Sequence, residues 1–152
     1  MKRTKNPAKE AEYRKRAADL VAQMTLHEKV SQMLSWAPAI ERLGIPAYNW
    51  WSEGIHGIGR AGTATVFPQA IGMAAAFDED MMEQVGNAVG VEARGKYNMC
   101  RAHGDRDIFK GLTVWAPNIN IFRDPRWGRG HETYGEDPFL TSRLGVRFVE
   151  GM

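Results

Sequence analysis

The side chains best suited to chemistry are concentrated in one polar stretch, Asn118–Leu140. Ionisable residues of both signs crowd its middle: Arg123, Asp124, Arg126, Arg129, His131, Glu132, Glu136 and Asp137. Interspersed prolines and glycines exclude a continuous helix, because proline lacks a donor N–H and glycine is a poor helix former. Such a loop either satisfies its charges by ion pairs or binds a polar ligand. The stretch is predicted to begin as a short strand, and binding sites of α/β folds lie after strand ends. This position favours ligand binding over internal ion pairs.

A second candidate segment, Ser52–Arg60, combines a carboxylate with closely spaced glycines. The glycines follow the order G-x-x-G-x-G, the reverse of the dinucleotide fingerprint, and no buried aliphatic strand precedes them, so we exclude a Rossmann site. The Glu53 carboxylate can accept several hydrogen bonds from a ligand, or it can pair with Arg60. Cys100 and His103 have the spacing of metal ligands, but no second pair of ligands accompanies them, so no metal is expected.

Helical and extended segments alternate along the chain, which is typical of a parallel α/β fold. A helix is predicted over residues 7–23, and Thr25 and Glu28 form a capping box for a second helix that ends near Pro38. A third, short helix runs to Ala76. Asp78 caps a long helix to about Tyr97, with a buried stripe formed by Met82, Val85, Val89 and Ala93. Residues 98–111 are predicted to be irregular, residues 112–117 a strand, and a last helix starts at Leu140.

Composition and charge narrow the class of protein. The chain has 152 residues, 43% hydrophobic and 25% charged, which is the globular range. The net charge of +2 gives no electrostatic case for a nucleic-acid or membrane partner. The single cysteine, Cys100, excludes an intrachain disulfide and fits a reducing compartment. The basic first residues precede no apolar segment of signal-peptide type, so a cytoplasmic location is expected.

The central stretch resembles the signature of glycoside hydrolase family 3, the β-glucosidase and β-xylosidase family. The resemblance rests on Asp-Pro-Arg-Trp-Gly-Arg at residues 124–129 and Glu-x-Tyr-x-Glu-Asp-Pro at residues 132–138, and it extends over residues 24–152. It implies the N-terminal portion of a (β/α)8 TIM-type barrel, preceded by a helical extension over residues 1–23. Such barrels need about 200–250 residues, so we expect a truncated barrel whose C-terminal part is a missing partner.

The resemblance also implies an activity. The expected function is part of a retaining, exo-acting β-glycosidase that hydrolyses terminal β-D-xylosyl or β-D-glucosyl residues of oligosaccharides or aryl glycosides, without a cofactor or metal. The family's nucleophile, acid/base and sugar-binding Lys-His pair come later than this sequence, so no catalytic residue is expected here. Glu132, Glu136 and Asp137 match structural positions. A non-catalytic sugar-binding fragment and an inert remnant stay open as alternatives.

Three residues match sugar-binding positions of the family: Glu53, Arg129 and, with more variable spacing, Arg60. Glu53 would accept hydrogen bonds from ring hydroxyls, while the planar fork of Arg129 would hold two adjacent hydroxyls or a carboxylate. Arg126 is interpreted as a member of a structural ion pair. At most one of four tryptophans is expected to stack on a sugar ring: Trp50, Trp51, Trp115 and Trp127. The segment around Glu53 is nearer the xylosidase and arabinofuranosidase branch.

Overall fold

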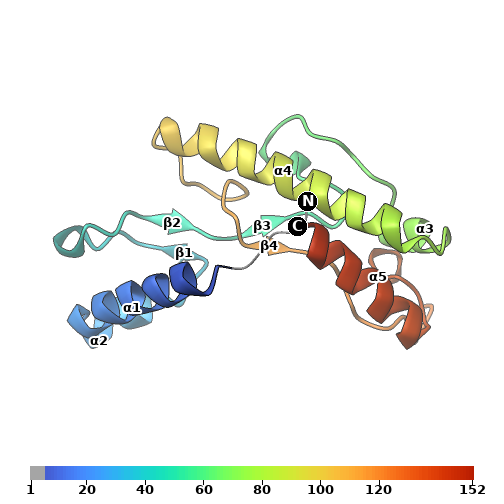
Figure 1. The fold of residues 1–152 in the computed structure, drawn as a ribbon, viewed down its shortest axis with the longest axis horizontal. Helices are drawn as coiled ribbons and strands as arrows, with labels where there is room; N and C mark the ends of the chain where they lie inside the picture. The colour runs from blue at the N-terminus through green and yellow to red at the C-terminus, as the bar shows by residue number, and fades with distance from the viewer. Residues whose placement is uncertain (1–5) are drawn as a thin grey trace. The chain divides into compact units, whose positions relative to one another are not determined.

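A computed structural model describes residues 6–152, which form two compact units, Met1–Tyr48 and Asn49–Met152. Each unit is described by itself, and Figure 1 gives the element labels. Lys2, Arg3 and Lys5, at the start of the predicted N-terminal extension, lie outside the described residues. No helix within residues 6–152 is long and apolar enough to cross a membrane.

The first unit begins with helix α1 (Pro7–Gln23), which has the predicted bounds. Asn6 caps it by accepting hydrogen bonds from the backbone N–H groups of Ala8 and Lys9, and Pro7 occupies the first turn, where no donor is missed. The helix has no buried side chain. Its apolar side chains are therefore not buried against the rest of this unit.

Helix α2 (Leu26–Ser31) starts at the predicted capping box, with Thr25 and Glu28 bonding to each other's backbone N–H. It ends at Ser31, so the prediction that it continues to near Pro38 is wrong. The chain turns back instead, and the Gln32 side chain donates to the Pro38 carbonyl at 2.9 Å. Two short strands follow, β1 (Trp36–Ala37) and β2 (Tyr48–Asn49), which pair with each other.

A turn and an ion pair connect these pieces of the first unit. The 3-10 helix η1 (Glu41–Leu43) ends at Gly44, whose φ of 65° is the left-handed conformation that glycine adopts without strain. Arg42, within that turn, donates to both carboxylate oxygens of Glu28, at 2.8 and 2.5 Å. Hydrogen bonds from the Arg42 side chain and from the Thr25 backbone lower the pKa of Glu28 to about 2.

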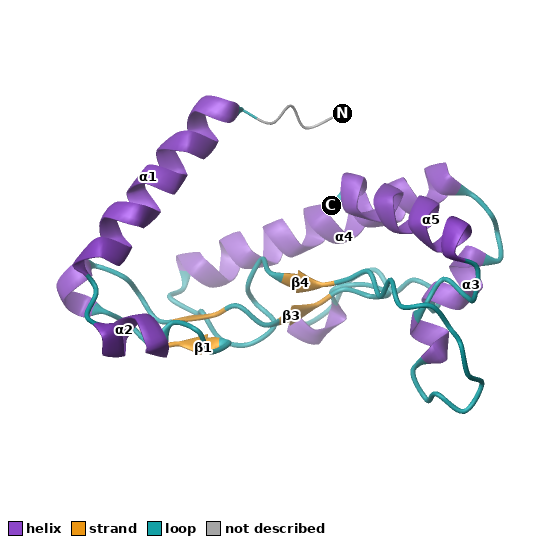
Figure 2. Ribbon diagram, turned by 90° about the horizontal axis from the view of Figure 1, so that it is seen from below, coloured by secondary structure: helices purple, strands orange, loops and turns teal. Residues whose placement is uncertain are grey.

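The core of the second unit is the contact between helices α4 (Glu79–Ala102) and α5 (Pro138–Gly151), which lie side by side in Figure 1 and Figure 2. Asp78 and Asp137 cap them. The predicted stripe is buried as expected: Met82, Val85, Val89 and Ala93. Leu144 and Phe148 of α5 pack against it, as does the short helix α3 (Ala70–Ala74). The glycines Gly86 and Gly151 allow the two backbones to approach closely.

Helix α4 is longer than the sequence predicted. Residues 98–102 continue the helix, so the prediction of irregular structure there is wrong. The end comes at His103 and Gly104, where Gly104 has a φ of 74° and its N–H bonds to the Arg101 carbonyl. Intrahelical hydrogen bonding continues through polar residues until this glycine stops it.

A parallel strand pair lies against α4. Strand β3 (Ser52–Glu53) pairs with β4 (Val114–Trp115) in the register Ser52–Val114 and Glu53–Trp115. The pairing is parallel, as the alternating pattern predicted. Gly54, which follows β3, lies against Val89 of α4 and Val114 of β4. This contact anchors the end of β3 to the helical core.

The sheet is much smaller than predicted. The strand expected over residues 112–117 contracts to Val114–Trp115, because Pro117 has no N–H to donate to a ladder. The prediction that a strand begins at Asn118 is also wrong. Only an isolated bridge joins Asn118 to Thr133, and the Asn118 side chain accepts a hydrogen bond from the Asn120 N–H. Within residues 6–152 the strands form two two-stranded sheets, so the TIM-type barrel stays a prediction.

Candidate functional site

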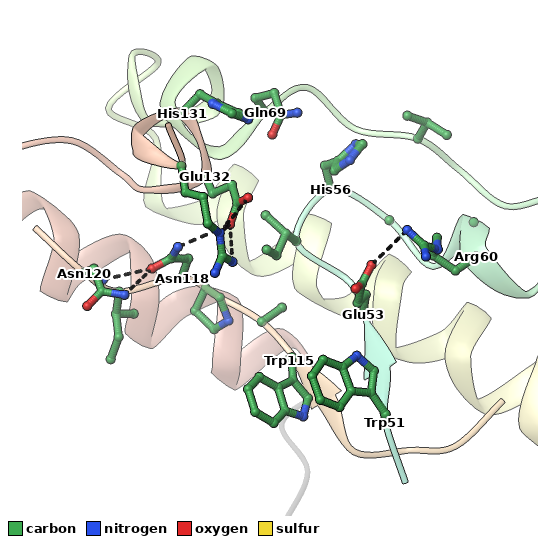
Figure 3. Close-up of a pocket in the computed structure, with 18 residues that line it drawn as sticks. Trp51, Glu53, His56, Arg60, Gln69, Trp115, Asn118, Asn120, His131 and Glu132 are labelled. Carbon is green, nitrogen blue, oxygen red and sulfur yellow. Dashed lines mark hydrogen bonds and ion pairs between the residues drawn. The ribbon is translucent and has the colours of Figure 1, made fainter. Parts of the chain in front are cut away.

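An open cavity of about 930 Å³ lies in the second unit, where β3 and β4 end (Figure 3). Its wall is rich in charged, amide and aromatic side chains. The residues that could contact a polar ligand are Trp51, Glu53, His56, Arg60, Gln69, Trp115, Asn118, Asn120, Arg129, His131 and Glu132. All three predicted binding residues, Glu53, Arg60 and Arg129, therefore line one cavity.

Glu53 is the last residue of β3 and faces the cavity beside Trp51 in Figure 3. Its carboxylate lies 3.6 Å from Nη1 of Arg60, and the two side chains are 40% and 62% exposed. The ion pair that the sequence offered as the alternative role of Glu53 is therefore present, but at more than hydrogen-bonding distance. Arg60 also lies over the Phe109 ring, 4.5 Å from its centroid. Such a long, exposed contact leaves the carboxylate able to accept other donors.

The loop that follows β3 is folded tightly on itself. Gly57 has a φ of 125°, and any Cβ at this position would collide with the Thr65 carbonyl oxygen. The Phe67 N–H donates to the His56 carbonyl at 2.8 Å, so the two arms of the loop run side by side. This close approach places Glu53 and Arg60 on the same wall of the cavity, with the 3-10 turn η2 (Gly59–Ala61) between the arms.

Two side chains of α4 anchor the loop from outside. Glu92 accepts hydrogen bonds from the Thr65 backbone at 3.0 Å and from the Thr65 hydroxyl at 2.6 Å. Lys96 donates to the carbonyl oxygens of Ala61 and Thr63, at 3.1 and 2.7 Å. The loop is therefore held at several points by the long helix of the core.

Arg129 reaches the cavity from the polar stretch that follows β4. Its Nε lies 3.0 and 2.9 Å from the two Glu132 oxygens, and its Nη2 lies 2.5 Å from Oε2. Hydrogen bonding from Arg129 lowers the pKa of Glu132, and the same bonds raise the pKa of Arg129. The charge of Glu53, which lines the same cavity, acts in the same direction on the pKa of Arg129.

The turn that carries Arg129 is internally braced. Thr133, fully buried, donates its hydroxyl to the Gly130 carbonyl at 2.7 Å and accepts from the Gly135 N–H at 3.2 Å. The Phe122 ring occupies the space that a side chain at position 130 would need. The turn itself is the 3-10 helix η3 (Gly130–Glu132). The orientation of this segment is therefore fixed by packing and hydrogen bonds together.

Arg126 has the ion pair that the sequence interpretation gave it, and its partner is Asp124. The pair is bidentate, at 3.0 and 2.6 Å, and the Arg126 side chain is 90% exposed. Arg126 does not line the cavity. Glu132, which the resemblance assigned to a structural position, pairs with Arg129.

The aromatic wall consists of stacked tryptophans. The rings of Trp51 and Trp115 are 4.7 Å apart and nearly parallel, at 10°, and both line the cavity. Trp50 also stacks on Trp115, at 6.3 Å and 8°. Trp127 instead meets Phe122 edge to face. Which of these rings contacts a sugar stays a prediction, and Trp51 and Trp115 are the two with access to the cavity.

The three amide side chains of the cavity were missed by reasoning from the sequence: Gln69, Asn118 and Asn120. That reasoning followed formal charge, and amides carry none. The position of Asn118 directly after a strand was a usable signal, because side chains at strand ends meet at one edge of a sheet. Within residues 6–152 no group of three or more histidine, cysteine or acidic residues could hold a metal ion. His103, of the considered Cys100–His103 pair, bonds to the Met99 carbonyl.

Comparisons with known proteins identify the family of the chain. The sequence profile of the glycosyl hydrolase family 3 N-terminal domain matches residues 15–152. The chain is 50% identical over 148 residues to probable β-D-xylosidase 7 of Arabidopsis thaliana, covering 91% of this chain and 18% of that protein. It is 49% identical over 141 residues to a xylan 1,4-β-xylosidase of Xylanibacter ruminicola, covering 91% and 16%.

Solved structures give the same result. A GH3 exo-β-xylosidase bound to a xylobiose aziridine probe superposes with a TM-score of 0.76 at 35% identity, over 90% of this chain and 18% of that one. A GH3 β-glucosidase of Bifidobacterium adolescentis superposes with a TM-score of 0.65 at 31% identity, over 86% and 18%. These proteins are all glycoside-cleaving enzymes by name. The chain belongs to glycosyl hydrolase family 3 and matches its N-terminal domain. It spans less than a fifth of the length of these relatives.

Proposed function

We propose that this chain forms the sugar-binding part of the site in a retaining, exo-acting β-glycosidase. The enzyme would remove terminal β-D-xylosyl or β-D-glucosyl residues from oligosaccharides or aryl glycosides. One observation carries the proposal: Glu53 at the end of β3 and Arg129 in the stretch after β4 line the same cavity where this parallel strand pair ends. A barrel gathers its site at that end of its strands, so we place the two loops on the working face of a TIM-type barrel.

The cavity suits a sugar chemically. A ring with adjacent hydroxyls both donates and accepts hydrogen bonds, and its C–H faces are apolar. Glu53 supplies a charged acceptor and Arg129 a charged donor, and charge-assisted hydrogen bonds are the stronger kind. The indole rings of Trp51 and Trp115, which stack on each other, supply an apolar part of the wall. Hydroxyl recognition and ring packing are thus available in one place.

The role that we assign to the chain is binding, and we place the nucleophile and the acid/base outside residues 1–152. A general acid needs a carboxyl group with a raised pKa, so that it holds a proton to donate. Glu132 is the opposite case, because hydrogen bonding from Arg129 lowers its pKa. A retaining mechanism also needs two carboxyl groups about 5 Å apart, one as the nucleophile and one as the acid/base. Glu132 is held by Arg129, and we assign Glu53, whose contact with Arg60 is longer, to sugar binding.

The preference between xylosyl and glucosyl substrates rests on the names of the relatives and on the position of Trp51. The two relatives with the sequence identities given above are named as β-xylosidases, while one of the similar structures is named as a β-glucosidase. Trp51 lies beside Glu53 on the cavity wall, where a large ring could occupy the space of the hydroxymethyl group that glucose has and xylose lacks. We therefore expect the xylosyl group to be favoured.

A chimeric enzyme tests the proposal. Residues 15–152 of this chain would replace the matching segment of the Arabidopsis relative, and kcat/KM would be measured with 4-nitrophenyl β-D-xyloside and β-D-glucoside. We expect hydrolysis of the xyloside in particular. Glu53→Ala removes an acceptor from sugar hydroxyls, which costs about 2–4 kcal/mol of transition-state binding, or roughly 30- to 1,000-fold in kcat/KM.

Glu79→Ala is the matched control. Glu79 is also a glutamate paired with an arginine, Arg143, and it is 35% exposed, close to the 40% of Glu53, but it does not line the cavity. We expect this variant to keep kcat/KM within about threefold, because exposed ion pairs contribute little. A folded chimera that binds xyloside but never hydrolyses it would favour the alternative of a non-catalytic sugar-binding protein. Equal losses in both variants would remove the case for Glu53.

A further inference from the structure

We infer that Glu132 and Asn118 are positioning residues, which hold the Arg129 guanidinium in one orientation toward the cavity. The inference rests on the proposed function for the identity of the ligand. Neither Glu132 nor Asn118 was among the binding residues predicted from the sequence. Their effect on a sugar would pass through Arg129, because Glu132 is already occupied by that arginine.

The geometry of the pair is that of a clamp. Glu132 accepts from both Nε and Nη2 of Arg129, so the planar guanidinium cannot rotate without losing a hydrogen bond. Glu132 is 20% exposed, whereas Arg129 is 63% exposed. Glu132 is thus the more buried partner, and Arg129, which lines the cavity, is the more exposed one. No hydrogen bond from Nη1 of Arg129 to another described residue is found, so this nitrogen can donate to a ligand.

Asn118 connects the clamp to the end of β4. Its Nδ2 lies 3.4 Å from Oε2 of Glu132, and Figure 3 shows the two side chains facing each other. The Asn118 oxygen accepts from the side-chain amide of Asn120 at 2.8 Å, which fixes the orientation of the amide. The backbone bridge from Asn118 to Thr133 holds the two segments together. The strand end and the arginine turn are therefore linked through both backbone and side chain.

The other two arginine pairs near the site show why this one differs. Glu53 meets Arg60 through a single contact of 3.6 Å, which does not fix the guanidinium plane. Asp124 holds Arg126 as tightly as Glu132 holds Arg129, but Arg126 does not line the cavity. Only Arg129, of these three arginines, is both clamped and on the cavity wall. The Asp124–Arg126 pair thus serves as an internal control of equal chemistry.

The first arm of the test needs no sugar. In the ¹⁵N-labelled chain, hydrogen exchange of each arginine Nε–H is followed by NMR. We expect Glu132→Gln to speed exchange at Arg129 by about tenfold or more, the loss of one charge-assisted hydrogen bond, while Arg126 stays unchanged. Asn118→Ala should give a smaller change at Arg129. The control Asp124→Asn should act on Arg126 and leave Arg129 as it was.

The second arm measures the dissociation constant of methyl β-D-xyloside. Glu132→Gln and Arg129→Ala should each weaken binding, by about 5- to 30-fold for Glu132→Gln. In the Arg129→Ala background, Glu132→Gln should have no further effect, because a positioning residue acts only through the group it positions. If Glu132 had a purely structural role, Glu132→Gln would weaken xyloside binding by the same factor with Arg129 present and with Arg129→Ala.

Each outcome decides one of the two ideas. Unchanged exchange at Arg129 in both Glu132→Gln and Asn118→Ala overturns the positioning role, as does a fully additive effect on xyloside binding. If Glu132→Gln does not fold, Asn118→Ala alone decides through the exchange at Arg129. If the unmodified chain binds no xyloside, the proposed function fails in this chain, and the exchange data still decide whether Glu132 and Asn118 orient Arg129.

Discussion

Three glycines in the loop after β3 allow a graded test of the backbone geometry behind the site. At Gly59 the φ is not in the positive range and nothing lies within 4 Å of an added Cβ. At Gly62 the φ is +102°, but the nearest atom is the end of the Lys96 side chain at 3.7 Å. At Gly57 the φ is +125° and the added atom would meet the Thr65 backbone carbonyl. Alanine at position 59 therefore tests neither strain nor a clash, alanine at position 62 tests backbone strain alone, and alanine at position 57 tests strain together with a clash.

The expected costs follow from those differences. Gly59→Ala should change the free energy of unfolding by about 0.5 kcal/mol or less, or stabilise slightly by restricting the unfolded chain. Gly62→Ala carries backbone strain alone, about 1–2 kcal/mol. Gly57→Ala carries strain and a clash with a backbone atom that has no rotamer to change, so we expect about 3 kcal/mol or more.

Urea unfolding of the three variants, followed by circular dichroism, gives these free energies. Thermal unfolding provides a second measure, because each kcal/mol lowers Tm by roughly 2–8 °C. The order Gly59, Gly62, Gly57 is the essential result. Gly57→Ala should also weaken xyloside binding, because the arms of the loop separate and Glu53 and Arg60 lose their common wall. A Gly57→Ala variant as stable as Gly59→Ala would refute the loop geometry described above.

Further predictions concern pH, activity and surface. Because pairing with Arg42 lowers the pKa of Glu28 from 4.5 to about 2, its contribution to stability is present above pH 4.5 and is lost as the pH falls toward 2. The pKa of Glu132 is lowered too, so its contribution to stability is also lost as the pH falls. The free energy of unfolding in urea should therefore be smaller at pH 3 than at pH 6, and this difference should be smaller in the Glu28→Gln variant. The 152-residue chain by itself should not hydrolyse 4-nitrophenyl β-D-xyloside above a buffer blank. Leu26 and Met33 are 77% and 80% exposed, so we expect binding of an apolar dye, reduced in the Leu26→Ser, Met33→Ser variant.

Local signals predicted the helices well. The capping box at Thr25, the cap at Asp78 and the period of the stripe from Met82 to Ala93 are encoded within a few residues, and each appears where expected. Helix ends were less predictable. Helix α2 ends at Ser31 and α4 continues to Ala102, because those ends depend on where the chain must turn next.

Strands were predicted poorly, for a physical reason. A strand exists only through its partner, and the pairing of β3 with β4 joins residues more than sixty positions apart. Apolar residues near Asn118 suggested an extended strand, whereas the asparagine side chains there form local hydrogen bonds in place of a ladder. The parallel direction was still predictable, because it follows from the alternation of elements and not from any one residue.

Three charged residues that line the cavity were predicted from the sequence as binding residues, but its geometry and the place of Glu132 on its wall were not. Glu53, Arg60 and Arg129 were identified from motifs, but no pattern in the sequence gave the distance between Glu53 and Arg60. The pairing of Arg129 with Glu132 was likewise seen only in the three-dimensional structure.

The most direct test of the account is an NMR titration of the chain with xylobiose, observed at the tryptophan indole N–H groups. Trp51 and Trp115 line the cavity, whereas Trp127 packs on Phe122 and does not line it. We expect xylobiose to shift the Trp51 and Trp115 signals in a saturable way, to leave Trp127 unmoved, and to lose its effect in Glu53→Ala. Shifts at Trp127 alone, or saturable binding that survives Glu53→Ala unchanged, would contradict the claim that this cavity binds the sugar.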